Sequence, residues 1–94
     1  MSQYARGANF ERKVKELWED RGYFVVRSAG SKGPVDLVAI AYEYRPILIQ
    51  CKLTGMITAA EKKRLRELGE DYNCDTVIAY RKDGVYTEER ICLS

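Results

Sequence analysis

The chain has no histidine among its 94 residues, and this absence removes several kinds of chemistry. Serine–histidine and cysteine–histidine nucleophiles both need an imidazole base, so neither catalytic arrangement is available. The three cysteines are an odd number and form no C-x-x-C pair, so neither a disulfide framework nor a structural zinc site is supported.

Long apolar runs are also missing from the sequence. No segment approaches the ~20 apolar residues that a membrane span needs, and the start MSQYARGANF lacks a secretory hydrophobic region. We therefore expect a cytoplasmic protein with reduced thiols and no membrane partner.

Charge of either sign is nearly balanced, with a formal net charge of +2, so the total says little about partners. The distribution of the basic residues is more informative, because four of them fall within residues 62–66 (KKRLR). Such a run is typical either of a solvated helix face or of a surface that binds nucleic acid. The sequence alone does not separate these two interpretations.

The length predicts one domain spanning residues 1–94. A first helix is expected from about Ala8 to Arg21, and Gly22 is a plausible stop. Its apolar face is set by helical spacing and consists of Phe10, Val14, Leu17 and Trp18. A short strand follows at residues 23–27. Residues 35–41 and 47–52 then predict two apolar strands that form an antiparallel hairpin.

The second half of the chain predicts one more helix and two more strands. Thr58 is a candidate N-cap for a helix running to about Asp71. The side chains expected to face inward are Ile57, Leu65, Leu68 and Tyr72. A buried strand at 76–81, a turn at Asp83-Gly84 and a last strand reaching Cys92 complete the chain. The predicted fold class is α/β, with a central mixed sheet flanked by helices in the order α-β-β-β-α-β-β.

Three polar side chains mark the ends of the hairpin strands: Asp36, Gln50 and Lys52. Because side chains at i and i+2 of a strand share a face, Gln50 and Lys52 point together while Cys51 turns away. A carboxylate, an amide oxygen and an ammonium on one patch suit a hard divalent cation beside a phosphate, and Mg²⁺ takes such oxygen ligands. The alternative is a strand-end ion pair between Asp36 and Lys52.

Two neighbouring features add to this patch. Glu11 lies on the first helix and is expected to project towards the sheet as a further carboxylate, although an exposed helix residue would look the same. The segment RSAGSKG (residues 27–33) places hydroxyls, cations and small residues directly before Asp36. Small residues let a backbone approach a phosphate, but an ordinary turn has a similar composition.

Together these residues resemble the archaeal-type Holliday junction resolvases of the PD-(D/E)XK nuclease superfamily. Residues 6–12 (RGANFER) are similar to the family's G-x-N-x-E-R start, and residues 23–27 (YFVVR) with Ser31 are similar to its strand, arginine and loop serine. Residues 35–39 (VDLVA) occupy the place of its Pro-Asp strand, and residues 49–52 (IQCK) stand where it has Glu-x-Lys. The resemblance covers most of the chain in the right order.

The resemblance implies a restriction-endonuclease-like core and a metal-dependent endonuclease that acts as a homodimer on four-way DNA junctions. It would cut two opposed strands and leave 5′-phosphate ends, with Mg²⁺ as the cofactor and Mn²⁺ as the alternative. The implied catalytic residues are Asp36, Gln50, Lys52 and Ser31. The implied metal ligands are Glu11, Asp36, Gln50 and the main-chain carbonyl of Cys51. The implied DNA contacts are Arg6, Arg12, Arg27, Ser31, Lys32, Lys63 and Arg64.

This sequence departs from the family pattern at two positions. Val35 replaces a proline that only stiffens the start of the strand. Gln50 replaces the glutamate, so an oxygen ligand is kept but its negative charge is lost, and we expect weaker Mg²⁺ binding and better activity with Mn²⁺. The alternatives are a catalytically inactive DNA-binding module of the same fold, a nuclease for other branched or duplex DNA, and a partner-binding domain without nucleic acid.

Overall fold

The computed structural model describes residues 3–28, 35–54 and 56–92. The elements are α1 (Gln3–Asp20), β1 (Phe24–Arg27), β2 (Leu37–Ile40), β3 (Ile47–Lys52), α2 (Ala59–Tyr72), β4 (Asp75–Lys82) and β5 (Val85–Cys92). Their order is the predicted α-β-β-β-α-β-β, and the strand predicted at 47–52 has the observed bounds. The first helix begins about five residues earlier than predicted, because its first turns carry no apolar face by which spacing could detect them.

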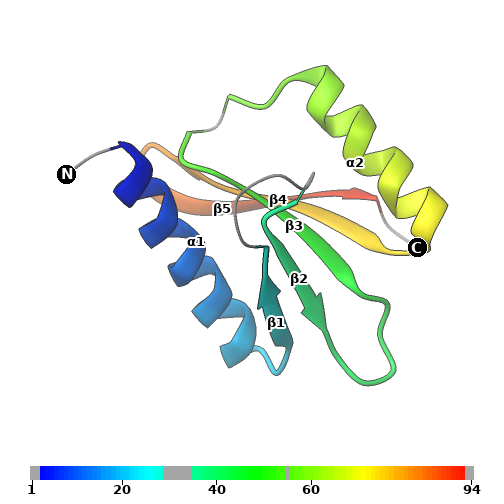
Figure 1. Ribbon diagram of the computed structural model, residues 1–94. Helices are drawn as coiled ribbons and strands as arrows, with labels where there is room; N and C mark the ends of the chain where they lie inside the picture. The colour runs from blue at the N-terminus through cyan, green and yellow to red at the C-terminus, as the bar shows by residue number, and fades with distance from the viewer. Residues whose placement is uncertain (1–2, 29–34, 55, 93–94) are drawn as a thin grey trace.

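All five strands form one sheet in the order β1-β2-β3-β4-β5, which Figure 1 shows between the two helices. β1, β2 and β3 form an antiparallel meander, β3 and β4 are parallel, and β4 and β5 are antiparallel. Parallel neighbours cannot be joined by a tight turn and need a crossover connection, which α2 provides here. The sheet is therefore mixed, as predicted.

Helix α1 packs on one face of the sheet and forms the main core. Phe10, Val14 and Trp18 are almost fully buried there, together with alternate residues of the strands such as Ile47 and Ile49. The helical spacing of these residues puts them on one stripe, and the strand alternation supplies the matching surface. No helix in the described part of the chain is long and apolar enough to cross a membrane.

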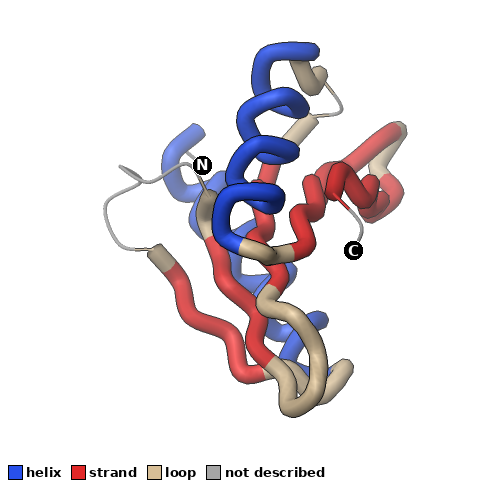
Figure 2. The backbone as a smooth tube through the Cα atoms, turned by 90° about the vertical axis from the view of Figure 1, so that its right-hand side faces the viewer, coloured by secondary structure: helices blue, strands red, loops and turns tan. Residues whose placement is uncertain are grey.

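Helix α2 contacts β4 and β5 from the opposite face, as the perpendicular view in Figure 2 also shows. Thr58 is its N-cap, as predicted, and accepts a hydrogen bond from the Glu61 N–H. Leu65 is buried as predicted, whereas Tyr72 is 70% exposed and its predicted inward position is wrong. The helix ends at Tyr72, one residue later than predicted, and Asn73 caps it in a left-handed conformation. The chain then turns, and Cys74 is the buried residue that follows.

Two turns fix the ends of these elements. Gly22 has a φ of 98°, a conformation that a side chain would strain, and it ends α1 before β1. Asp83 and Gly84 have φ values of 53° and 78°. Two successive positive φ angles are characteristic of the tight turn that matches the twist of a hairpin, so the predicted turn between β4 and β5 is confirmed.

Candidate functional site

The site lies where β2 and β3 separate. Their pairing ends at Leu37 and Ile49, so Asp36 and Gln50 are the next residues on the two strands. The backbone of Asp36 is fixed on both sides, because its N–H donates to the Ile49 carbonyl (2.9 Å) and its carbonyl accepts from the Ser28 N–H (2.8 Å). The hairpin predicted from the sequence thus brings Asp36 beside Gln50.

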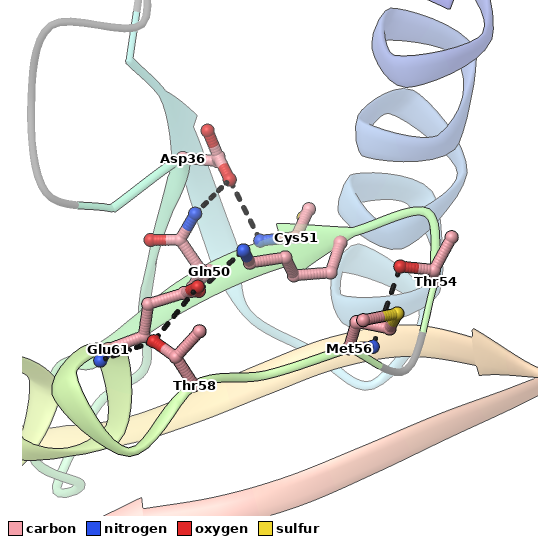
Figure 3. A network of polar contacts seen from close by, with 8 residues as sticks. Asp36, Gln50, Cys51, Thr54, Met56, Thr58 and Glu61 are labelled. Atoms are coloured by element: carbon pink, nitrogen blue, oxygen red, sulfur yellow. Dashed lines mark hydrogen bonds and ion pairs between the residues drawn. The ribbon is translucent and has the colours of Figure 1, made fainter.

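The Asp36 carboxylate bridges to β3 through one oxygen. Its Oδ2 accepts hydrogen bonds from the Cys51 N–H at 2.8 Å and from the Gln50 Nε2 at 3.3 Å, both drawn in Figure 3. The hydrogen bond from the backbone N–H holds the carboxylate in one orientation. In this orientation Gln50 turns its amide nitrogen to Asp36, and its amide oxygen points away (Figure 3).

Lys52 pairs with α2 rather than with the strand-end aspartate. Its Nζ lies 2.5 Å from the Glu61 Oε2, and the structure pairs it with no other acid in the described residues. The alternative of an Asp36–Lys52 ion pair is therefore wrong. The hydrogen bond from Lys52 is the main reason that the pKa of the Glu61 carboxyl is lowered. Lys52 thus keeps its charge partner on the α2 face of the sheet.

Cys51 points to the other face, as its place between Gln50 and Lys52 predicted. Its side chain packs against the α1 core. Burial raises the pKa of its thiol, and the carboxylates of Asp36 and Glu11 raise it further, whereas Arg27 opposes them. The thiol is therefore protonated. The carboxylates of Asp36 and Glu11 both act electrostatically on Cys51.

Glu11 approaches the same point from α1. Its side chain is 17% exposed, and its Oε1 accepts a hydrogen bond from the Arg27 Nε at 3.1 Å. A cavity of about 300 Å³ is lined by Glu11, Cys51 and Lys52 together with Gly7, Phe10, Leu53 and Thr54. Glu11 therefore projects towards the sheet, as the sequence analysis expected.

The donors present are of the kind that Mg²⁺ and Mn²⁺ bind. Asp36 and Glu11 offer carboxylate oxygens. Within a strand the N–H and C=O of one residue point to the same side, so the Cys51 carbonyl faces the Asp36 side, past the last β2–β3 pair. In the described residues no three acidic or thiol side chains converge closely enough to form a complete metal cage. This donor set fits an ion that keeps several of its waters.

The predicted DNA-binding residues other than Arg6 fall into three groups. Ser31 and Lys32 lie outside the described residues, so the structure does not test them. Arg27 is committed to Glu11, and Arg12 donates from its Nη1 to the Asn9 Oδ1 at 3.2 Å. In the basic run of α2, Lys62 pairs with Glu89 at 2.8 Å and Lys63 lies 4.0 Å from Glu67, whereas Arg64 is exposed.

The remaining predicted DNA contact, Arg6, lies on a second basic surface whose other cations, Lys13 and Arg81, were not singled out from the sequence. Arg6, Lys13 and Arg81 line a hollow of about 240 Å³ together with Asn9, Phe10 and Leu53. Two of these residues, Phe10 and Leu53, also line the cavity beside Lys52, so the two hollows adjoin. Among the described residues the structure shows no ion pair for these three cations; Arg81 lies over the Phe10 ring, 5.3 Å from its centroid. No local signal joins Lys13 to Arg81, because packing alone brings α1 and β4 together.

The class of fold is defined by a mixed sheet between two helices, with an acid and a lysine where two strands separate. This is the restriction-endonuclease-like fold expected from the sequence. It superimposes on the structure of Archaeoglobus fulgidus Hjc, described as a Holliday junction resolvase from an archaeal hyperthermophile. The TM-score is 0.72 over 92% of this chain and 73% of that chain, at 19% identity.

The sequence identifies the family within this class. The family model for the archaeal Holliday junction resolvase (Hjc) matches residues 2–89, and the chain therefore belongs to that family. It is also 46% identical over 53 residues to the crossover junction endodeoxyribonuclease Hjc of Methanocaldococcus jannaschii. That match spans 56% of this chain and 38% of the relative, so well under half of the relative's length is aligned.

Proposed function

We propose that this protein is a metal-dependent DNA endonuclease that cuts opposed strands of four-way junctions. The observation that carries the proposal is the Asp36 carboxylate, held by the Cys51 N–H where β2 and β3 separate, with Lys52 one residue further along β3. Family membership adds the substrate class, because both relatives are named for junction cleavage or resolution.

In this proposal Asp36, Glu11 and the Cys51 carbonyl would hold Mg²⁺ or Mn²⁺. An ion held there would supply Lewis acidity, lowering the pKa of a water and stabilising charge on the phosphate. Arg27 holds the Glu11 carboxylate in place, and Lys52 would orient the attacking water or the phosphate. Gln50 would add its amide oxygen to the ligands if its amide turned from the orientation described above. Ser31 and Lys32, next to this site in the sequence, contact the phosphate backbone.

The hollow formed by Arg6, Lys13 and Arg81 gives the DNA backbone a path away from the site. Three cations that meet no acidic partner among the described residues are suited to phosphate oxygens, and phosphate neutralisation is the main source of DNA affinity. Arg12 on α1 and, on the opposite face of the sheet, Lys63 and Arg64 on α2 are the other proposed DNA contacts. A junction has two-fold symmetry, so two copies of the chain would place one site on each of the opposed strands. Work on chromosomal DNA in an archaeal-type cell would take place in the cytoplasm.

The test is cleavage of a labelled four-way junction beside its matching linear duplex, with Mg²⁺ and separately with Mn²⁺. We expect paired symmetric nicks in the junction and none in the duplex. Asp36→Ala and Lys52→Ala should abolish cleavage while junction binding persists, and Asp71→Ala on the exposed surface of α2 is the matched control. Equal cleavage by the parent and Asp36→Ala would contradict the proposal.

A second candidate is a DNA-binding module of the same fold that no longer cuts. The observation in its favour is that Gln50 lacks a charge and turns its amide nitrogen to Asp36. Such a protein would bind junctions tightly with a strong salt dependence and would leave them intact with either metal. The cleavage assay above separates the two candidates.

The proposed DNA path has its own measurement. Log affinity falls linearly with log salt concentration. Removing one phosphate contact reduces the magnitude of this slope by about 0.9 on duplex arms. We expect Arg81→Ala and Lys13→Ala each to lower the slope by about this amount. Arg45→Ala, which removes an exposed charge from the connection between β2 and β3, should leave the slope as it is. A slope unchanged in both hollow variants would rule out this path.

A further inference from the structure

The ion pair between Lys52 and Glu61 joins the end of β3 to the first turn of α2. The 2.5 Å contact is half-buried, with the two side chains 28% and 32% exposed. Lys52 is the lysine of the proposed site, so the group that holds its ammonium matters for the chemistry. That group comes from a different element of the fold.

Gln50 cannot provide this charge. It is the residue of β3 that shares a face with Lys52, two positions earlier on the strand. Its side chain is neutral, and its amide nitrogen is already directed to Asp36 at 3.3 Å. The strand therefore carries an uncompensated lysine at the site, and the nearest described carboxylate that meets it is that of Glu61.

Glu61 is held so that its carboxylate faces Lys52. Its N–H donates to the Thr58 Oγ1 at 3.1 Å, and the Thr58 hydroxyl donates to the Glu61 Oε1 at 3.2 Å. One carboxylate oxygen is thus bonded to the helix cap, and the other, Oε2, is bonded to Lys52. Figure 3 shows Glu61 and Thr58 beside β3, on the side where Gln50 lies.

We infer that Glu61 is a positioning residue for Lys52 and supplies from α2 the negative charge that position 50 lacks. The inference rests on the proposed nuclease function. A strand that carries glutamate and lysine two residues apart has one negative and one positive charge on this face. Here the same two charges are present, but the carboxylate is on the helix. The ammonium keeps a fixed acceptor, and Gln50 stays available to Asp36 or to a metal ion.

The role of Glu61 can be tested by moving its carboxylate from α2 to position 50 of β3. Glu61→Gln should slow single-turnover junction cleavage by about 10- to 100-fold, the scale of a misplaced catalytic group. Junction affinity should not change. The double variant Gln50→Glu/Glu61→Gln should regain most of the lost rate, because the strand then supplies the charge. Glu70→Gln removes an exposed carboxylate from the same helix and should cut like the parent.

Thr58→Ala distinguishes the contribution of the helix cap from that of the Glu61 charge. This variant loses the cap hydroxyl and its hydrogen bond to the Glu61 Oε1 but keeps the Glu61 carboxylate. It should melt at a lower temperature and slow cleavage at 25 °C by less than Glu61→Gln does, because the Glu61 Oε2 can still meet Lys52. If Thr58→Ala slowed cleavage as much as Glu61→Gln, the effect would belong to the cap and the positioning role would be overturned.

Two readouts do not depend on cleavage. In the parent the hydrogen-bonded ammonium of Lys52 should give a resolved ¹H–¹⁵N signal by NMR, and Glu61→Gln, unlike Glu70→Gln, should lose it. Calorimetry with Mn²⁺ should give equal affinities for the parent and Glu61→Gln. Weaker Mn²⁺ binding in Glu61→Gln would make Glu61 a metal ligand and would overturn the positioning role.

Failure of the two proposals can be told apart. If the parent cut no junction with either metal, the nuclease function would fall, and the positioning role would fall with it. If the parent cut and Asp36→Ala did not, but Glu61→Gln was as fast as the parent, the positioning role alone would be overturned.

Discussion

On one face of the sheet α1 buries Phe10, Val14 and Trp18, whereas on the other face α2 buries only Leu65 and Gly69. Ion pairs make up part of the difference in burial, since the Lys52–Glu61 and Lys62–Glu89 pairs attach α2 to β3 and β5. Half-exposed ion pairs stabilise a fold much less than buried aromatic and aliphatic side chains do. The α1 face therefore contributes most of the stability of the fold. The α2 face carries polar pairs, and one of them includes Lys52 of the proposed site.

Among substitutions on the two faces, Trp18→Ala is expected to lower the free energy of unfolding most. Trp18 is 1% exposed and packs edge-on against Tyr23, with ring centroids 5.0 Å apart. Removing a buried tryptophan costs about 3–5 kcal/mol of unfolding free energy. Urea denaturation followed by circular dichroism would measure this loss. A loss below about 1 kcal/mol, the range of surface substitutions, would contradict the assignment of the main core to α1.

Leu65→Ala should cost less, about 2–3 kcal/mol, at the lower end for a buried leucine. Leu65 is 2% exposed, but the polar and exposed residues around it leave α2 more freedom to close the space. The same denaturation experiment gives the value, with Leu68→Ala as a half-buried control. A larger loss for Leu65→Ala than for Trp18→Ala would reverse the comparison.

A smaller effect is expected from Thr58→Ala. The hydroxyl satisfies the Glu61 N–H in the first turn of α2, and loss of an N-cap side chain costs about 1 kcal/mol. Thermal unfolding would show the change, and Thr58→Ser should retain most of the stability because serine caps equally well. Equal losses for the alanine and serine variants would contradict the role of the cap.

The smallest effect is the pH dependence of the Lys52–Glu61 pair. Because the pKa of Glu61 is lowered in the folded protein, the pair stabilises the fold above the carboxyl's unfolded pKa, and this stability is lost as pH falls through the folded pKa. Exposed pairs of this kind contribute below about 1 kcal/mol. Parent and Glu61→Gln should therefore differ slightly at pH 7 and converge as the pH falls through the folded pKa of Glu61. A difference that grew on acidification would have the wrong sign.

The elements that the sequence predicted well are those with a strong local pattern. Ile47–Lys52 is an apolar run ended by polar and charged residues, and its bounds were confirmed. The Asp83-Gly84 turn was predictable from its residue types. Tyr72 was misplaced because helical spacing continues to the end of a helix, whereas the burial of α2 depends on where the chain turns into β4.

The site was predictable to the extent that it depends on the hairpin. Pairing of residues 35–41 with 47–52 brings Asp36 beside Gln50 in any antiparallel register close to the observed one. The contact of Lys52 with Glu61 and the hollow formed by Lys13 and Arg81 depend on how helices are placed over the sheet. Spacing along a single sequence contains no information on such contacts.

The parallel pairing of β3 with β4 has a kinetic consequence. The β1–β2–β3 meander and the β4–β5 hairpin join strands that are close in sequence, but β3–β4 pairs Ile47 with Asp75 and Lys52 with Tyr80. Closing this long loop costs more chain entropy than forming the hairpins, so we expect it to come late in folding. Helix α2, which carries Glu61, docks on β4 and β5 and so takes its final place over the sheet when this loop closes. A nascent chain would thus complete the proposed site in the same step that completes its sheet.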